Sequence, residues 1–174
     1  MDVHSRKLAR GLGRLLAVLL AICGIGLVLL IPAMIIAFVS PDMLAGDYTT
    51  RVNGQPFDPS QPLVAGTLLL MGIVFIAVAA FVLFKLRQVM ATVAQGDPFV
   101  PVNAKRLRAI AGGLGALLVA QSLGGLLVPP AVQIAARSEF HFNFGLFLAT
   151  LVVLVLAEVF REGARLRADA EGTI

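Results

Sequence analysis

The residues best suited to chemistry lie in one segment, GDPFVPVNAKRLRAIAGG, at positions 96–113. Its chemistry is recognition, because it combines a turn, an apolar side chain and several amide and guanidinium donors. Phe99 has two readings: it tucks against the neighbouring helix ends, or it inserts into a partner. The candidate partner-binding residues are Gly96, Asp97, Pro98, Phe99, Asn103, Arg106 and Arg108, together with Thr173 and Ile174.

The chain lacks the residue patterns of catalysis. It contains no H-E-x-x-H, no G-x-S-x-G and no P-loop, each of which places a defined catalytic or phosphate-binding group. Its two histidines, His4 and His141, and its one cysteine, Cys23, are widely separated and do not make a metal site. We therefore expect a non-enzymatic protein without catalytic residues, cofactor or metal.

The composition indicates an integral membrane protein. Hydrophobic residues make up 59% of the 174 residues, and the mean hydropathy is +0.93, whereas a soluble domain is roughly 45–50% apolar. Crossing a hydrocarbon core of about 30 Å takes roughly 20 apolar residues in a helix. Four runs meet that length, at residues 15–39, 63–84, 109–128 and 142–160. The first run is longer than the about 7–15 residues of a signal-peptide core, so we expect it to stay as a helix. The expected fold is a single all-α domain, a bundle of four transmembrane helices.

The basic residues indicate the orientation of that bundle. Of the 14 lysines and arginines, all but Arg51 and Arg137 lie near the two termini or in the middle loop. Loops rich in Lys and Arg stay in the cytoplasm. We therefore expect an inner-membrane protein with both termini inside, an outer loop at 40–62, a cytoplasmic corner at 85–108 and a cytoplasmic tail at 161–174. The pI near 10.0 then reflects topology and contact with anionic lipid, and we expect no direct nucleic-acid binding.

Local signals predict the ends of the elements. In DYTTRVNGQPF, Asn53-Gly54 is a hairpin signal, and an irregular loop is the alternative. The apolar pattern of the second helix continues past Phe84 for about two turns and ends at Gly96. Asp97-Pro98 reads as an N-cap followed by N1, and Asn103 as a cap before the third helix.

Polar groups inside the spans have structural interpretations. We expect Gln121 and Ser122 to form hydrogen bonds between helices. Glu158 ends the fourth span, where it can pair with Arg161 or with the basic residues at 105–108.

The third span carries a face of small residues, which lets helix backbones approach closely. Its partner is either another helix of the chain or the same face of a second copy, which would make a homodimer. The first and third spans also share GLG-x-LL cores, GLGRLLAV and GLGALLVA, which favours two parallel helical-hairpin repeats. The small residues are Gly112, Ala116, Ala120 and Gly124.

The corner and the tail together resemble a known family, the YoaS-like bacterial four-helix membrane proteins, whose domain has unknown function. The resemblance rests on a G-x-P-F-x-x-x-N-x-x-R-L-R-x-I pattern and an F-x-x-G-x-x-L-x-x-D-x-x-x-T-I pattern. It implies no catalytic residues, and it implies a neighbouring Xre-type helix-turn-helix regulator as partner. The matching positions are Gly96, Pro98, Phe99, Asn103, Arg106, Leu107, Arg108 and Ile110, then Phe160, Gly163, Leu166, Asp169, Thr173 and Ile174.

Three functions fit this reading of the sequence. The leading one is a regulatory or sensor protein that binds a cytoplasmic partner through the corner and the tail. The alternatives are a small transporter or channel and a structural subunit of a larger membrane complex. Few polar residues lie in the spans, so the sequence favours the first over a transporter.

Overall fold

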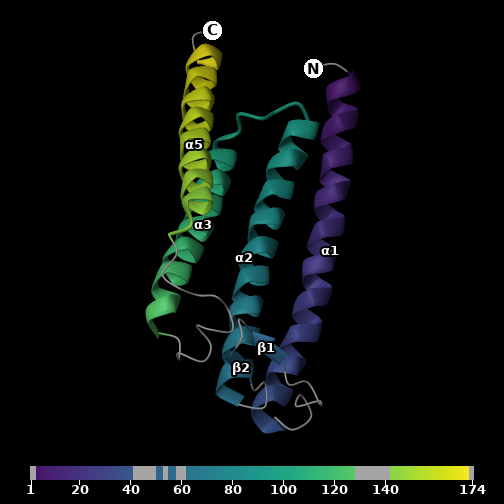
Figure 1. Cartoon of the computed structure of the whole chain (residues 1–174). Helices are drawn as coiled ribbons and strands as arrows, with labels where there is room; N and C mark the ends of the chain where they lie inside the picture. Colours follow the sequence, from purple (N-terminus) through teal and green to yellow (C-terminus); the bar gives the residue numbers. More distant parts are fainter. Residues whose placement is uncertain (1–2, 41–49, 53–54, 58–61, 128–141, 173–174) are drawn as a thin grey trace. The chain divides into compact units, whose positions relative to one another are not determined.

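Helices dominate the computed structural model, which describes residues 3–40, 50–52, 55–57, 62–127 and 142–172. In these residues the chain forms four α-helices and one small antiparallel hairpin (Figure 1). No cis peptide bond occurs in the described part. The elements are α1 (Val3–Val39), β1 (Thr50–Val52), β2 (Gln55–Phe57), α2 (Pro62–Ala94), α3 (Pro101–Leu127) and α5 (Phe144–Glu171).

Three of the helices are long and apolar enough to cross a membrane. The candidate spans are Gly11–Val39, Gly66–Ala94 and Phe144–Glu171. Their large apolar side chains face outward: Val28 is 70% exposed and Val155 is 62% exposed. A soluble protein rarely leaves so much apolar surface uncovered, so these surfaces indicate contact with lipid. The prediction of a helical membrane protein is confirmed at this level.

The predicted fourth span, 109–128, coincides with most of α3, which is not one of the three candidate spans found in the described residues. Basic residues lie near the start of α3, and its apolar run ends outside the described residues. Both facts shorten the apolar stretch of α3 that could count as a span. A fourth span stays a prediction, as does the orientation of the helices.

The segment between α1 and α2 contains the hairpin that its sequence predicts. Strands β1 and β2 pair antiparallel, with Thr50 opposite Phe57 and Val52 opposite Gln55. The pairing places the two arms on either side of positions 53–54, which lie outside the described residues. The strands are three residues each, a length at which pairing alone contributes little stability.

The chain divides into two units, and the first contains both candidate recognition segments. It comprises Met1–Ile22, Val78–Ala116 and Phe144–Ile174. Its buried core consists of Leu107 and Ile110 from α3 and Ala157 from α5. Half-buried side chains of α2, α3 and α5 pack around this core, namely Val82, Leu86, Leu114, Val153 and Phe160.

Glycines allow close packing in both units. In the first unit, a Cβ on Gly113 would lie 3.4 Å from Phe81, and one on Gly115 would lie 3.8 Å from Thr150. The second unit, Cys23–Ala77 and Leu117–Asn143, uses two contacts between α1 and α2. There, a Cβ on Gly26 would lie 3.3 Å from Ile76, and one on Gly66 would overlap the Phe38 ring.

The predicted small-residue face on α3 is not the face that packs. Gly112, Ala116 and Ala120 are exposed, and a Cβ on Gly112 would meet nothing within 4 Å. The close contacts instead come from Gly113 and Gly115, which lie on a different side of the helix. A pattern of small residues every four positions identifies a narrow face without saying whether anything covers it. The exposure of Gly112 and Ala116 favours a second copy over an intrachain partner, and both stay predictions; the exposure of Gly124 lies outside the described part.

The predicted interhelical hydrogen bond of Ser122 is also wrong. Its hydroxyl donates to the Leu118 carbonyl of its own helix, at 2.9 Å. Thr150 behaves in the same way toward Leu146, at 2.8 Å. In an apolar helix a short hydroxyl side chain satisfies its donor most easily on the preceding turn.

Candidate functional site

The corner begins with a helix end that the sequence predicts correctly. Gly96 has φ +89°, a left-handed conformation that glycine adopts without steric cost. The Gly96 N–H donates to the Val93 carbonyl and the Asp97 N–H donates to the Thr92 carbonyl, both at 3.0 Å. This pair of bonds is the Schellman motif, which satisfies the last carbonyls of α2. Gly96 therefore ends α2 and turns the chain toward α3.

The start of α3 corrects the sequence-based prediction. Asp97-Pro98 does not open a helix, because Pro98 and Phe99 form a turn and α3 begins at Pro101. Two prolines follow Gly96 within a few residues, and either could occupy the first helical position. Pro101 takes that position, so Asn103 lies inside the first turn of α3 instead of capping it.

Asn103 connects the turn to the end of α2. It is fully buried, at 0% exposure. Its amide nitrogen donates to the Thr92 hydroxyl at 2.6 Å and to the Pro98 carbonyl at 2.9 Å. The Thr92 hydroxyl in turn donates to the Val89 carbonyl at 2.7 Å. Both amide hydrogens are thus used, as a buried polar group requires.

Arg106 completes this network from the next turn of α3. One of its guanidinium nitrogens, Nη1, donates to the Asn103 side-chain oxygen at 2.9 Å and to the Gln88 carbonyl at 3.1 Å. Gln88 lies in α2, so this side chain also ties the two helices together. Asn103 and one guanidinium nitrogen of Arg106 therefore hold the corner together, and their contact with a partner stays a prediction.

Phe99 packs against the tail. Its ring centroid lies 5.4 Å from that of Phe160, with the rings tilted by 45°. A Cβ on Gly163 would lie 2.6 Å from Phe99 Cδ1, so only glycine leaves room for the ring in this position. Of the two readings of Phe99, the structure shows the first. Phe99 nonetheless stays 39% exposed.

Ion pairs join the corner to the tail at two levels. Asp97 pairs with Arg167, which also donates to Glu171 at 2.8 Å. Arg108 contacts Glu158 at 3.2 Å, and Glu158 also pairs with Arg161. Both predicted partners of Glu158 are therefore present. All of these groups are substantially exposed, so the pairs position the tail more than they stabilise it.

Apart from the contact between Arg167 and Asp97, the end of the tail is exposed. Residues 165–172 are all exposed, and Leu166 is 59% exposed. Arg165 pairs with Glu162 of the same helix at 2.8 Å. The end of α5 is thus a helix held at its base by Phe99 and Asp97. Thr173 and Ile174, predicted to contact a partner, lie outside the described residues.

Sequence reasoning found most of this site and missed part of it. The structure brings Gly96, Asp97, Pro98, Phe99, Asn103, Arg106 and Arg108 together in one unit. It adds Thr92, which looked like an ordinary helical residue, and Arg167, which looked like one of several tail arginines. Neither has a local pattern that reveals its partner, since that partner lies on another helix. No cluster of metal-binding side chains occurs in the residues that the structure describes.

Comparison with known proteins gives one match. The model of the family DUF2975, a protein of unknown function, matches residues 49–174, which is more than half of the chain. No curated protein and no solved structure matches the chain significantly. The matched region contains α2, α3 and α5 and thus the whole corner and the described tail. The chain therefore belongs to the DUF2975 family of proteins of unknown function.

Proposed function

We propose that this chain is a non-enzymatic regulatory protein of the bacterial inner membrane that binds a soluble cytoplasmic partner through its tail. The observation that carries the proposal is the uncovered end of α5, residues 165–172, whose base is held by Phe99 and Asp97. A helix that projects without cover, yet is fixed in position at its root, is suited to binding another protein.

The proposed surface combines apolar and charged groups. Leu166 and Phe99 leave 59% and 39% of their surfaces exposed, and Arg165 and Arg167 flank Leu166 in sequence. An apolar centre within a charged border is the usual composition of a protein-binding surface. Lipid is a less suitable occupant, because this end of α5 carries four ionisable residues between 165 and 171 that the apolar interior of a bilayer would not accept.

The membrane placement is part of the same proposal. α3 would supply the fourth span, and the corner and both termini would lie in the cytoplasm. The distribution of lysine and arginine supports this placement. The two hairpin repeats would follow from it, because both hairpins would then start on the same side.

The partner class comes from the resemblance noted in the sequence, which implies a small helix-turn-helix regulator. The chain would then hold that regulator at the membrane. The transporter alternative has less support, because Ser122 and Thr150 bond within their own helices. The other alternative, a structural subunit of a larger membrane complex, would use the same exposed end of α5. It differs only in that other membrane proteins would bind there.

Photo-crosslinking in living bacteria tests the proposal. A crosslinking residue at Leu166 should capture a soluble DNA-binding protein, whereas one at Phe99 should capture the protein's own tail. The same residue at Val155, an outward-facing position in the candidate span, should capture neither and serves as the control. Capture of a large membrane complex in fixed stoichiometry at Leu166 would support the structural alternative instead. Absence of any protein adduct at Leu166 would count against both.

A further inference from the structure

A pocket between α1 and α2 in the first unit has the features of a ligand site. It has a volume of about 310 Å³, which lies at the small end of the range of roughly 300–1,000 Å³ found for ligand sites. Its lining brings Gly13, Arg14 and Ala17 of α1 opposite Arg87, Met90 and Ala91 of α2. The pocket exists because glycine and alanine have small side chains, and the two arginines place positive charge at its edge.

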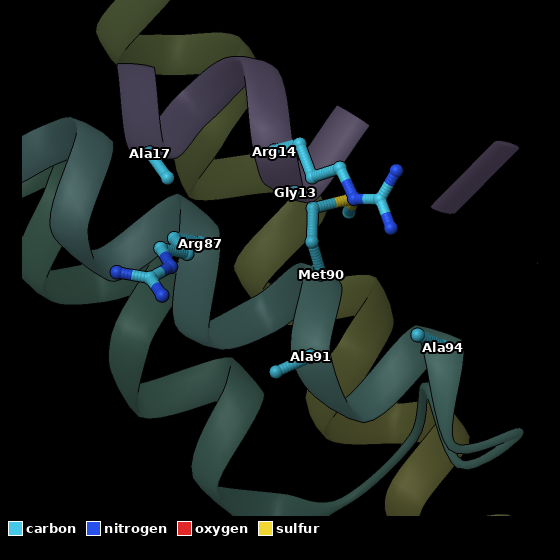
Figure 2. A pocket seen from close by; sticks show the side chains of 7 residues that line it. All are labelled: Gly13, Arg14, Ala17, Arg87, Met90, Ala91 and Ala94. Atoms are coloured by element: carbon cyan, nitrogen blue, oxygen red, sulfur yellow. The ribbon is translucent and has the colours of Figure 1, made fainter. Parts of the chain in front are cut away.

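The shape of the pocket follows from the residue spacing. Gly13 and Ala17 lie one turn apart on α1, and Arg87, Ala91 and Ala94 lie one turn apart on α2. A Cβ on Gly13 would meet nothing within 4 Å. Figure 2 shows the short alanine side chains around the space, with the guanidinium groups of Arg14 and Arg87 pointing away from each other and out of the pocket.

The two arginines border a mostly apolar lining, and no described residue pairs with either of them. Arg14 lies in the candidate span Gly11–Val39 and Arg87 lies in Gly66–Ala94. Among the described residues neither forms a hydrogen bond or an ion pair, whereas Arg106, Arg108 and Arg161 all do. Arg14 and Arg87 also lie just outside the apolar runs 15–39 and 63–84, at the level where anionic lipid headgroups can supply a counter-ion. Both guanidinium groups are exposed, so they can rotate toward an anion at the mouth of the pocket.

We propose that this pocket binds one anionic phospholipid, with Arg14 and Arg87 holding its phosphate and the alanine-lined space holding the apolar part next to it. A guanidinium group matches phosphate oxygens with two parallel hydrogen bonds. The lining is mostly apolar, as a lipid requires and a free anion does not. The inference rests on the proposed placement of residues 85–108 at the cytoplasmic surface, where anionic headgroups lie.

The test uses the purified full-length protein, stripped of lipid in a neutral detergent. Retention of added lipid is measured by native mass spectrometry, with phosphatidylglycerol compared with phosphatidylcholine. We expect wild type to bind phosphatidylglycerol about tenfold more tightly, and the double variant Arg14→Gln/Arg87→Gln to lose about that preference. The control Lys105→Gln/Arg165→Gln removes the same charge outside the pocket and should stay within about threefold of wild type.

Two further arms separate a lipid site from other forms of anion binding. Gly13→Leu fills the space without changing charge, and we expect it to weaken phosphatidylglycerol binding as much as the arginine double variant does. Inorganic phosphate should not displace the lipid. The proposal is overturned if the control double variant loses as much affinity, if Gly13→Leu binds like wild type, or if inorganic phosphate competes. Because this assay uses no partner and no intact membrane, its failure is distinct from a failure of crosslinking at Leu166.

Discussion

The Asn103 amide nitrogen lies 2.6 Å from the Thr92 hydroxyl oxygen, and this bond joins the first turn of α3 to the last turns of α2. It is supported by the Asn103 bonds to the Pro98 carbonyl and from Arg106. A short helix–turn–helix connection is thereby held by a side chain that is fully buried, Asn103, and by two that are partly buried, Thr92 and Arg106.

Replacing Asn103 should therefore cost substantial stability. Asn103→Leu removes three side-chain hydrogen bonds, takes this donor from the Pro98 carbonyl and leaves Arg106 with only the Gln88 carbonyl, a loss of about 3 kcal/mol in the free energy of unfolding. Thermal unfolding in detergent measures it, as a midpoint lowered by roughly 5–10 °C. Gln95→Leu, which changes an exposed amide beside the same turn, should shift the midpoint by less than about 2 °C. Equal shifts in the two variants would show that the buried network is not the cause.

Adding a methyl group at Gly163 should displace Phe99, because the new Cβ would lie 2.6 Å from the ring. The chain contains no tryptophan, so Phe99→Trp supplies a single fluorescent reporter of this contact. In that background, Gly163→Ala should shift the emission to the red and increase quenching by acrylamide.

Gly112→Ala is the matched control for that substitution. It should leave the emission unchanged and stabilise α3 by up to about 1 kcal/mol, because alanine is the better helix former and the site is open. If Gly163→Ala also left the fluorescence unchanged, the docking of Phe99 on the tail would be disproved.

The Asp97–Arg167 pair should contribute little to stability despite linking the corner to the tail. Both side chains are exposed, at 39% and 49%, and exposed pairs are worth about 0–1 kcal/mol. A double-mutant cycle with Asp97→Asn and Arg167→Gln should give a coupling energy below about 1 kcal/mol that falls further as salt rises. A larger coupling that resists salt would mean that the pair is shielded from water in the protein's natural surroundings.

The orientation of the chain can be measured by cysteine labelling. In a Cys23→Ala background, a membrane-impermeant maleimide should label Asn53→Cys in intact cells stripped of their outer membrane. It should label Gln95→Cys only after the inner membrane is opened. The expectation follows from the concentration of basic residues at 85–108. The reverse pattern of labelling would invert the proposed topology and place the corner outside.

The sequence predicted the elements better than their contacts. The extension of α2 past Phe84, the Gly96 helix end and the outer hairpin were all predicted from short-range signals, because each depends on local backbone conformation. The start of α3 was predicted at the wrong residue. Pro98 and Pro101 could each occupy the first helical position. In the structure Pro101 occupies it, and Asn103 donates a hydrogen bond back to the Pro98 carbonyl.

Contacts between helices could not be read from local patterns. Gly113 and Gly163 each accommodate an aromatic ring from another helix, while Gly112 faces open space. All three occur in similar apolar or mixed helical sequence. Only the packing of α2, α3 and α5 distinguishes them, and a pattern of small residues in the sequence does not reveal it.

The contact between Phe99 and Gly163 also has a consequence for biogenesis. Phe99 is synthesised before α5, which supplies both Gly163 and Phe160. During translation the corner can form its own hydrogen bonds as soon as Arg106 has emerged, but the Phe99 ring has no cover until the last helix follows. On an unfinished chain the ring therefore lacks its contacts with Phe160 and Gly163, and it gains them only when α5 has been made.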